Sequence, residues 1–566
     1  MDVPVIREPL QIETLPRMFM RSVKLRPHKT ALLMQKGGLK QEYTYSQLQE
    51  RIECLARSLR ELGFKHGDKI AIIGENCPDW EMSYLGIQWA GCVVVPLDRM
   101  LKVAEVRHIL RNSDAAGIIS TESYSAVVDE ALLEIDRKIK RISTGTPSKG
   151  WLSLEALVTE GAELKAFEPP SNIEDLAAIL YTSGTTGQAK GVMLTHHNIG
   201  SNVSGAYQIL DFGEEDVFIS ILPLHHSFEA TAGFLTPLCC GCKIVFSPSL
   251  KSREILETMA THNVTLMLGV PLLYEKIVEG IQRQVRESSA FKRFIFNAGM
   301  NIGKFAKGIS KAMFKSVRQA MGMDKVRFLV SGASALAPWA SSFMERLGLP
   351  ILQGYGLTET SPVISVNRLK NPHNVSVGPP LPGIEIRIDS PDENGNGEIV
   401  VKGAPVMKGY YKNPEATKEV LSEDGWLKTG DLGRIDENSM LYITGRAKNL
   451  IVTAAGKNVY PEEIEAVVGQ SQYIQEILVY GYHNEATGRE EVHAIVVPNY
   501  ELFDAEMPDI TEKELEEFVR GQVKAECAKL ADYKRIKRFE IREEELPKTT
   551  TRKVKRYLFT KKQVKV

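Results

Sequence analysis

A run rich in glycine and hydroxyl-bearing residues at 181–191 has the composition of a phosphate-binding loop. Glycines let backbone N–H groups approach an anion closely, hydroxyl groups add donors, and a lysine adds positive charge. The residues that carry this chemistry are Thr182, Ser183, Gly184, Thr185, Thr186, Gly187 and Lys190. The spacing differs from that of a Walker loop, in which a lysine and a serine or threonine directly follow the last glycine and open a helix.

The surroundings of this run favour a phosphate loop over the alternative interpretation, a polar surface turn. An apolar strand is predicted at 176–180, directly before the run, and Lys190 stands three residues past Gly187. Residues 191–194 predict a second strand, and Thr195 suits the N-cap of a following helix.

A second segment with chemical potential lies at 351–360. It places Tyr355 between two glycines and follows it with Thr358 and Glu359, which suits base stacking and a magnesium ligand. The turn of small residues at 332–336 follows a predicted strand and leaves room for a flat ring to pack against the backbone.

Histidine and cysteine give weaker signals. His225 and His226 stand at the end of a predicted strand, and a structural role for each is the alternative interpretation. The seven cysteines show no disulfide or zinc spacing, and the cluster at 239–242 has no histidine or second cysteine pair nearby. We interpret the cysteines as buried small residues in a reducing compartment.

Composition indicates a globular protein of two or more domains, with 566 residues, 43% apolar and 25% charged. A net charge of −1 gives no argument for nucleic-acid binding. Charge is uneven, since residues 529–566 carry 14 Lys/Arg against 5 Asp/Glu and residues 281–326 carry 10 against 2. Early charged residues and prolines exclude a signal peptide and no window predicts a transmembrane helix, so we expect a cytoplasmic protein.

Alternating helical patterns and short apolar strands over residues 45–130 predict an α/β fold of layered sheets. The segment 441–449 has the features of a domain junction, because the pattern after it changes to β-α-β-β-like elements. We therefore expect domains at 1–447 and 448–566.

Nearly the whole chain resembles the adenylate-forming (AMP-binding) superfamily, because five segments occur in the order typical of that superfamily. They are Tyr181–Gly191, Gly354–Glu359, Thr429–Asp431, Gly445–Arg446 and Lys553. Within that superfamily, the stretch 456–465 and the basic insert at 281–326 most resemble long-chain fatty acyl-CoA synthetases. The resemblance implies a large N-terminal domain of layered sheets and helices, a small mobile C-terminal α+β domain, and a hinge at Lys448.

The resemblance also assigns roles. It implies that the 182–190 loop binds the β- and γ-phosphates of ATP, that Thr358 contacts the α-phosphate, and that Glu359 holds Mg²⁺. It further implies that His226, in preference to His225, borders the substrate carboxylate and that Lys553 is the catalytic lysine. The implied adenine contacts are Gly332, Ala333 and Tyr355, and the implied ribose contacts are Asp431 and Arg446.

The implied reaction activates a medium- to long-chain fatty acid as an acyl-adenylate and transfers the acyl group to CoA, with ATP and CoA as co-substrates. Two alternatives stay open: transfer to an acyl carrier protein, and an inactive sensor of nucleotide or acyl groups. Two positions depart from the family pattern. Ala189 stands where proline is usual, and Arg552 replaces the glycine before the catalytic lysine.

The basic insert has its own pattern. Apolar residues recur at steps of three or four and share one helical face; they are Phe291, Phe294, Ala298, Ile302, Phe305, Ile309 and Met313. Four lysines, at 304, 307, 311 and 315, fall on another face. One interpretation is a helix packed on the large domain, although three glycines weaken a single long helix. The other is a peripheral surface for the inner face of an anionic membrane.

Overall fold

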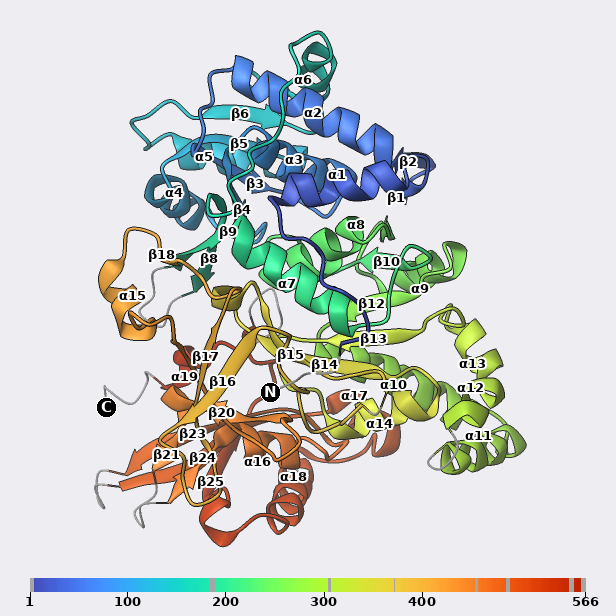
Figure 1. Cartoon of the computed structure of the whole chain (residues 1–566). Coiled ribbons are helices and arrows are strands. Elements are labelled where there is room, and N and C mark those ends of the chain that lie inside the picture. Colours follow the sequence, from blue (N-terminus) through green and yellow to red (C-terminus); the bar gives the residue numbers. More distant parts are fainter. Residues whose placement is uncertain are drawn as a thin grey trace. The chain divides into compact units, whose positions relative to one another are not determined.

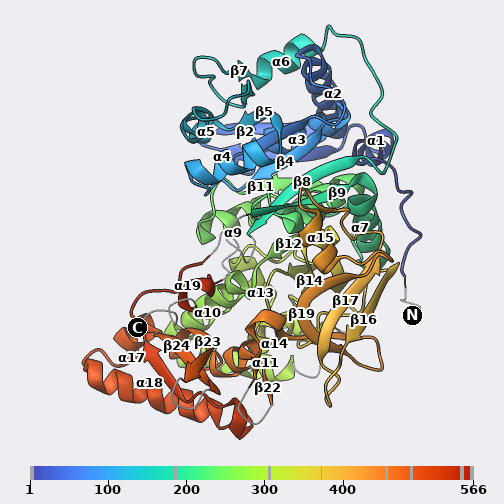
Figure 2. The same cartoon turned by 90° about the vertical axis from the view of Figure 1, so that its left-hand side faces the viewer.

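The computed structural model describes residues 5–183, 189–303, 307–370, 372–452, 457–484, 489–548 and 554–560 (Figures 1 and 2). The chain forms two compact units. The first comprises Met1–Leu336, Ser341–Ile386 and Val401–Leu427; the second comprises Ala337–Ala340, Arg387–Val400 and Lys428–Val566. The expected α/β architecture, with a large N-terminal part and a smaller C-terminal part, is confirmed. The domain boundary at 448 and the hinge stay predictions.

One eight-stranded sheet of the first unit has the order β18-β9-β8-β4-β3-β5-β6-β7. Its strands in chain order are β3 (Lys69–Ile73), β4 (Val93–Leu97), β5 (Ala115–Ser120), β6 (Lys140–Ser143), β7 (Leu152–Ser153), β8 (Leu176–Ser183), β9 (Ala189–Thr195) and β18 (Gly409–Tyr410). Neighbours β4, β3, β5, β6 and β7 run parallel, whereas β8 and β9 form an antiparallel hairpin.

The other eight-stranded sheet has the order β15-β14-β13-β12-β10-β11-β1-β2. Its strands are β1 (Thr30–Lys36), β2 (Leu39–Thr44), β10 (Val217–Ser220), β11 (Lys243–Phe246), β12 (Leu266–Gly269), β13 (Phe328–Ser331), β14 (Ile351–Gly356) and β15 (Val363–Val366). From β14 to β1 the neighbouring strands are parallel. Their carboxyl ends therefore share one sheet edge, where ligands commonly bind in α/β folds.

Two helices of this part begin at capping boxes that the sequence supplies. Thr44 and Gln47 make a capping box for α2, and Thr195 and Asn198 make one for α7, as expected from Thr195. The helices are α1 (Leu15–Leu25), α2 (Tyr45–Glu61), α3 (Pro78–Trp89), α4 (Val103–Asn112), α5 (Ser125–Leu132), α6 (Leu154–Gly161), α7 (His196–Ile209), α8 (Thr236–Cys239), α9 (Ser252–Thr261), α10 (Pro271–Glu287), α14 (Pro338–Arg346) and α15 (Pro414–Val420).

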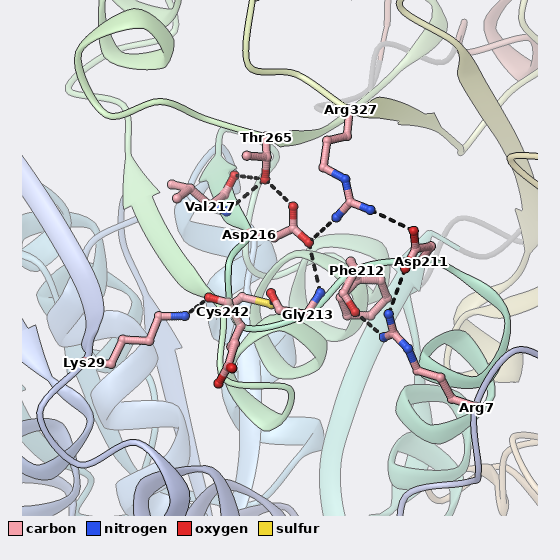
Figure 3. Close-up of polar contacts among 11 residues, drawn as sticks. Arg7, Lys29, Asp211, Phe212, Gly213, Asp216, Val217, Cys242, Thr265 and Arg327 are labelled. Carbon is pink, nitrogen blue, oxygen red and sulfur yellow. Dashed lines mark hydrogen bonds and ion pairs between the residues drawn. The ribbon is translucent and has the colours of Figure 1, made fainter.

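A charged network around the buried Asp216 secures the starts of three strands in the second sheet (Figure 3). Asp216, 2% exposed, precedes β10; its carboxylate accepts from Thr265 Oγ1 at 2.7 Å and from Arg327 Nη1 at 2.6 Å. Arg327 also reaches Asp211 at 2.9 Å. Removing the partner of a buried charge strongly destabilises a protein, so this network fixes the start of β10. The histidine loop follows the other end of that strand.

The basic insert folds as separate short helices, α11 (Ala290–Ile302), α12 (Lys307–Met313) and α13 (Lys315–Ala320), which lie together in Figure 1. Gly303 ends α11, so the glycines break the run as their propensity predicts. Phe296 packs on Phe314, with ring centroids 5.2 Å apart. The expected apolar face, in contrast, is largely uncovered where it is described, because Phe291 and Phe294 are 72% and 71% exposed. The expectation that this face packs on the large domain is therefore wrong for these residues.

The second unit contains a three-stranded sheet, in the order β23 (Ile474–Asn484), β24 (Arg489–Pro498) and β25 (Arg538–Ile541). Helices α16 (Pro461–Val468), α17 (Tyr500–Glu506) and α18 (Glu512–Cys527) share an apolar core with it. A short pair is formed by β21 (Ile451–Val452) and β22 (Asn458–Val459), and α19 (Tyr557–Thr560) follows near the end. A four-stranded sheet orders β16 (Ile384–Asp389), β17 (Gly397–Gly403), β19 (Leu427–Ile435) and β20 (Leu441–Arg446).

None of the described helices combines the length and the apolar character needed to cross a bilayer.

Candidate active site

The predicted phosphate loop joins the strands β8 and β9. Thr182 pairs with Lys190 and Ser183 with Ala189, so the hairpin holds Lys190 directly across from the entry to the loop. Gly184, Thr185, Thr186 and Gly187 lie outside the described residues. The expected strand after the loop is confirmed as β9, with Thr195 as the N-cap of α7.

Tyr410 brings the loop lysine and the predicted metal ligand into one cluster. Strand β18 pairs with β9, which sets Tyr410 beside Lys190, and the Lys190 ammonium lies 5.1 Å from the centre of the Tyr410 ring. The Tyr410 hydroxyl donates to Glu359 Oε1 at 2.8 Å. Burial first, and then the Glu359 carboxylate, raise the pKa of the Tyr410 hydroxyl, so it remains a donor at neutral pH.

Glu359 is held in place by its own backbone as well. It lies in a 3-10 turn, η3 (Thr358–Thr360), and its carbonyl accepts from the Met407 N–H at 2.8 Å. A lysine, a tyrosine hydroxyl and a carboxylate are thereby set together by segments far apart in the sequence. A cation and a half-buried carboxylate that both contact one tyrosine suit a polyphosphate carried with a divalent metal.

The loop after β10 approaches the same turn. Ser227 Oγ lies 3.3 Å from Thr358 Oγ1, which places the histidine loop beside the predicted α-phosphate ligand. The His225 and His226 rings are 4.1 Å apart between centroids. His225 Nε2 lies 3.5 Å from Asp98 Oδ2, an ion-pair distance that is long for a hydrogen bond. His225 therefore lies next to Asp98 without a hydrogen bond to it, and His226 lies beside His225.

The predicted adenine contacts follow β13 and β14 at the carboxyl edge of the sheet. A Cβ at Gly332 would lie 3.0 Å from the Phe228 ring, so a side chain there is disfavoured. Ala333 has a φ of +74°, a left-handed conformation that costs a non-glycine residue energy and is concentrated at functional sites. Tyr355 is half-buried in β14, opposite Ser365 of β15. These positions share the sheet edge with the histidine loop.

The predicted ribose ligands lie in the second unit, on adjacent strands. Asp431 of β19 pairs with Arg446 of β20, and Arg446 Nε lies 2.8 Å from Asp431 Oδ1. The Asp431 side chain is 4% exposed and that of Arg446 is 39% exposed, so the arginine retains an open side. Lys448 is exposed in a 3-10 turn, η4 (Ala447–Asn449), that follows β20.

Lys553 and Arg552 fall outside the described residues. The residues flanking them are paired, since Lys548 and Val554 form an antiparallel bridge and the Lys555 N–H donates to the Pro547 carbonyl at 2.8 Å. Lys548 Nζ forms an ion pair with Glu545 at 3.0 Å and also pairs with Glu476.

Among the described residues, no group of three or more His, Cys, Asp or Glu could hold a metal by itself. One carboxylate still fits Mg²⁺, which usually takes one or two protein carboxylates and completes its shell with waters and substrate phosphates. Glu359, with one oxygen held by Tyr410, meets that requirement.

The structure adds Tyr410, Ser227 and Asp98 to the residues predicted from the sequence. No spacing signal identifies Tyr410, because its role depends on the pairing of β18 with β9. Ser227 stands directly after the histidine pair and could have been included on that ground. Asp98 follows β4, and only the folding of the two sheets brings it to His225.

Two family models match the chain. The AMP-binding enzyme family matches residues 19–411, and the AMP-binding enzyme C-terminal domain matches residues 463–553. The first match alone covers more than half of the chain.

Named relatives agree with these matches. The chain is 29% identical to a long-chain-fatty-acid–[acyl-carrier-protein] ligase of Arabidopsis thaliana, over 86% of this chain and 76% of that protein. It is 29% identical to a long-chain-fatty-acid–CoA ligase of Escherichia coli, over 98% of this chain and 95% of that protein.

A solved structure agrees with the fold. ATP-bound MatB from Rhodopseudomonas palustris is similar, with a TM-score of 0.77, 27% identity, and coverage of 96% of this chain and 98% of that chain. The chain therefore belongs to the AMP-binding enzyme family, and it is an adenylate-forming acid–thiol ligase.

Proposed function

We propose that this protein activates a medium- to long-chain fatty acid with ATP and transfers the acyl group to CoA, releasing AMP and pyrophosphate. The observation that carries the proposal is the cluster of Lys190, Tyr410 and Glu359. Thr358, in the same turn as Glu359, lies 3.3 Å from Ser227 of the histidine loop, measured between the side-chain oxygens. This arrangement supplies positive charge, a fixed carboxylate and hydroxyl donors where a nucleotide triphosphate and an acid must meet.

The first half-reaction joins two anions. A carboxylate oxygen attacks the α-phosphorus of ATP, the bond to the pyrophosphate oxygen breaks, and an acyl-adenylate forms. Lys190 binds the departing phosphates, and Thr358 donates to the α-phosphate. Lys553 offsets the repulsion between the carboxylate and the α-phosphate. Asp431 and Arg446 hold the ribose, while Gly332, Ala333 and Tyr355 frame the adenine.

Glu359 would hold Mg²⁺, which screens the charge of the phosphates when it is bound. Tyr410 donates to one carboxylate oxygen and so fixes the direction in which Glu359 presents the other. In the second half-reaction a thiol attacks the acyl carbonyl carbon and AMP leaves.

CoA and an acyl carrier protein are the two candidate acyl acceptors. The two relatives described above bear the names of a CoA ligase and of an acyl-carrier-protein ligase. The CoA ligase matches nearly the full length of both chains, and this favours CoA, with the carrier protein as the alternative. An inactive sensor is disfavoured, because Lys190, Glu359 and Lys553 are all retained.

A pyrophosphate-release assay tests the proposal. Acids from acetate to C18 are screened with ATP and Mg²⁺, first without acceptor and then with CoA or with acyl carrier protein. We expect release to peak at a medium or long chain and CoA to accelerate turnover. If carrier protein accelerates turnover and CoA does not, the acceptor is the carrier protein. If no acid leads to pyrophosphate release, the proposed activity is overturned.

The proposal includes a lipid partner at the inner face of a membrane, supported by the insert helices α11 and α12. By the 100° rule, Phe291, Phe294 and Ile302 share a face of α11 that differs from the face of Phe296, which packs inward. Phe291, Phe294 and, on α12, Ile309 are 72%, 71% and 57% exposed.

Charge decides between the classes of partner for this surface. Residues 281–326 carry 10 Lys/Arg against 2 Asp/Glu, and Lys292, Arg293, Lys311 and Lys315 are all exposed. Each basic residue near an anionic bilayer contributes about 1 kcal/mol, and inserted aromatic rings add to this. We therefore assign the surface to an anionic bilayer rather than to a second copy of the chain, which would bring like charges together.

Co-sedimentation with liposomes tests this partner. Wild-type protein should bind phosphatidylglycerol vesicles at low salt and release them at high salt. Phe291→Ser with Phe294→Ser should abolish binding, whereas the matched pair Leu39→Ser and Leu133→Ser, at residues 79% and 83% exposed elsewhere, should not. The assignment would be overturned if both double variants lost vesicle binding equally, if the protein self-associated instead of binding vesicles, or if the wild type did not bind.

A further inference from the structure

A buried carboxyl group lies directly behind the histidine loop and plays no part in the chemistry above. Glu229 is 1% exposed and opens the π-helix η2 (Glu229–Leu235), three residues after His226. π-Helical turns are rare and are frequently found at functional sites. A carboxyl group in such a place is costly unless it is neutral or bonded.

Glu229 is the end of a hydrogen-bond chain that spans the start of the loop. Its Oε1 accepts from Ser220 Oγ at 2.9 Å, at the last residue of β10. Asn76 Nδ2 donates to the same Ser220 Oγ at 2.9 Å and to the Leu222 carbonyl at 2.6 Å, and Asn76 Oδ1 accepts from the Leu224 N–H at 3.2 Å. The backbone from which His225 and His226 follow is therefore tied to Glu229 through Ser220 and Asn76.

The rest of the Glu229 environment is tight. A Cβ at Gly233 would lie 2.5 Å from Glu229 Oε2, so a side chain at residue 233 would displace this carboxyl group. Glu81 of α3, 0% exposed, and Tyr274 of α10 are titratable groups that interact electrostatically with Glu229. Burial raises the pKa of Glu229 to about 8, and burial together with Glu229 raises that of Glu81. At neutral pH the Glu229 side chain is thus mainly a neutral acid, which glutamine resembles in size and charge.

We propose that Glu229 is a positioning residue, which orders the histidine loop for acyl-adenylate formation through the chain of Ser220 and Asn76. Its side chain is 1% exposed, so it acts through the backbone at 221–224 rather than by its own contact with substrate. The inference rests on the proposed function, because it takes His226 to border the substrate carboxylate.

Half-reaction kinetics test the proposal. Glu229→Ala should slow adenylate formation about tenfold, with the KM for ATP changed less than about twofold, because the phosphate ligands are untouched. Glu229→Gln should restore the rate to within about twofold of wild type, since its amide oxygen accepts from Ser220 in the same way. Asn76→Ala cuts the same chain at another link and should reproduce the slow rate if Glu229→Ala does not fold.

A readout that does not depend on activity accompanies the kinetics. Hydrogen exchange of the segment 221–229 should accelerate in Glu229→Ala and stay as in wild type in Glu229→Gln. Asp216→Asn provides the matched control, because it neutralises a 2% exposed carboxylate at the other end of β10 and keeps an oxygen that accepts from Thr265. That variant should leave exchange in 221–229 unchanged.

The outcomes separate the two proposals. If Glu229→Gln is as slow as Glu229→Ala, or if Glu229→Ala and Asn76→Ala leave rate and loop exchange unchanged, Glu229 does not position the loop. If the wild-type protein releases no pyrophosphate with any acid but loop exchange responds as expected, the proposed function fails and the ordering of the loop by Glu229 stands.

Discussion

At the scale of single residues, the chemistry depends on polar groups held by one or two specific partners. Glu359 receives a hydrogen bond from Tyr410, and Arg446 pairs with Asp431. Each pair fixes a side chain that is long enough to adopt several rotamers, so the partner determines where the functional group points.

Tyr410→Phe tests the first of these pairs. The ring stays beside Lys190 but the bond to Glu359 is lost, and a hydrogen bond to a charged group contributes about 1.5–3 kcal/mol. Adenylate formation should slow on the order of tenfold, with a higher Mg²⁺ requirement, as measured by pyrophosphate release across Mg²⁺ concentrations. Tyr411→Phe is the control, since Tyr411 donates to Asp114 at 3.0 Å in a comparable pair outside the cluster. Equal effects of the two variants would contradict the role of Tyr410.

Glu229→Gln should change how stability depends on pH. The folded pKa of about 8 lies above the ordinary value of 4.5, so the folded state holds a proton that the unfolded state releases. This contribution is complete below pH 4.5 and is lost as pH rises toward 8, at up to about 1.4 kcal/mol for each pH unit.

Thermal unfolding between pH 5 and 8 measures this effect. The wild-type Tm should fall more steeply with pH than that of Glu229→Gln. Glu42→Gln is the control, because hydrogen bonds from Lys40 and Thr30 lower the pKa of that carboxyl group and no such flattening is expected. Parallel Tm curves for wild type and Glu229→Gln would show that Glu229 is ionised in the folded protein.

At the scale of elements, short connections after strands carry the functional groups. The β8–β9 hairpin holds Lys190, the turn after β14 holds Glu359, and the loop after β10 holds the histidines. The strands hold these connections rigidly because they are paired on both sides. The turn η4 after β20 differs, since it is a single exposed 3-10 turn that contains Lys448.

Lys448→Pro tests whether this turn is the hinge. Proline fixes φ near −65° and removes an N–H, so it forbids a large backbone rotation at this residue. We expect one half-reaction to be impaired and the other to be spared, as measured separately with pyrophosphate release and with thioester formation from pre-made acyl-adenylate. Lys448→Ala, which keeps the backbone free, should retain both. Wild-type rates of both half-reactions in the proline variant would place the hinge elsewhere.

At the scale of the whole molecule, the two compact units divide the predicted contacts. The residues predicted to bind the phosphates and the substrate carboxylate lie in the first unit. Asp431, Arg446 and the residues that flank Lys553 lie in the second. Two half-reactions that need different groups suit a protein with a mobile second domain, because one arrangement can supply the lysine and another can admit the thiol.

Lys553→Ala should separate the two half-reactions. Loss of a positioned charge in a water-excluded site costs on the order of 3 kcal/mol, so adenylate formation should slow about a hundredfold. Thioester formation from pre-made acyl-adenylate should be largely spared. Lys555→Ala, two residues further along the same basic segment, is the control and should be close to wild type. Equal loss of both half-reactions would refute the assignment of Lys553.

The sequence by itself determined the features that depend on local composition. Apolar runs located the strands on either side of the phosphate loop, Thr195 identified a helix start, and the order of glycine and hydroxyl runs indicated the family. Such features are readable because propensity, capping and turn chemistry act over a few neighbouring residues.

Only the tertiary structure decided which distant groups meet. Tyr410 reaches Glu359 because β18 adds to the edge of β9, and Glu229 reaches Asn76 through Ser220 because β10 ends beside the segment that precedes α3. Whether the apolar residues of the insert are covered was decided in the same way, and Phe291 and Phe294 are not. Burial, pairing and raised pKa values arise from contacts across the fold, and no local pattern encodes them.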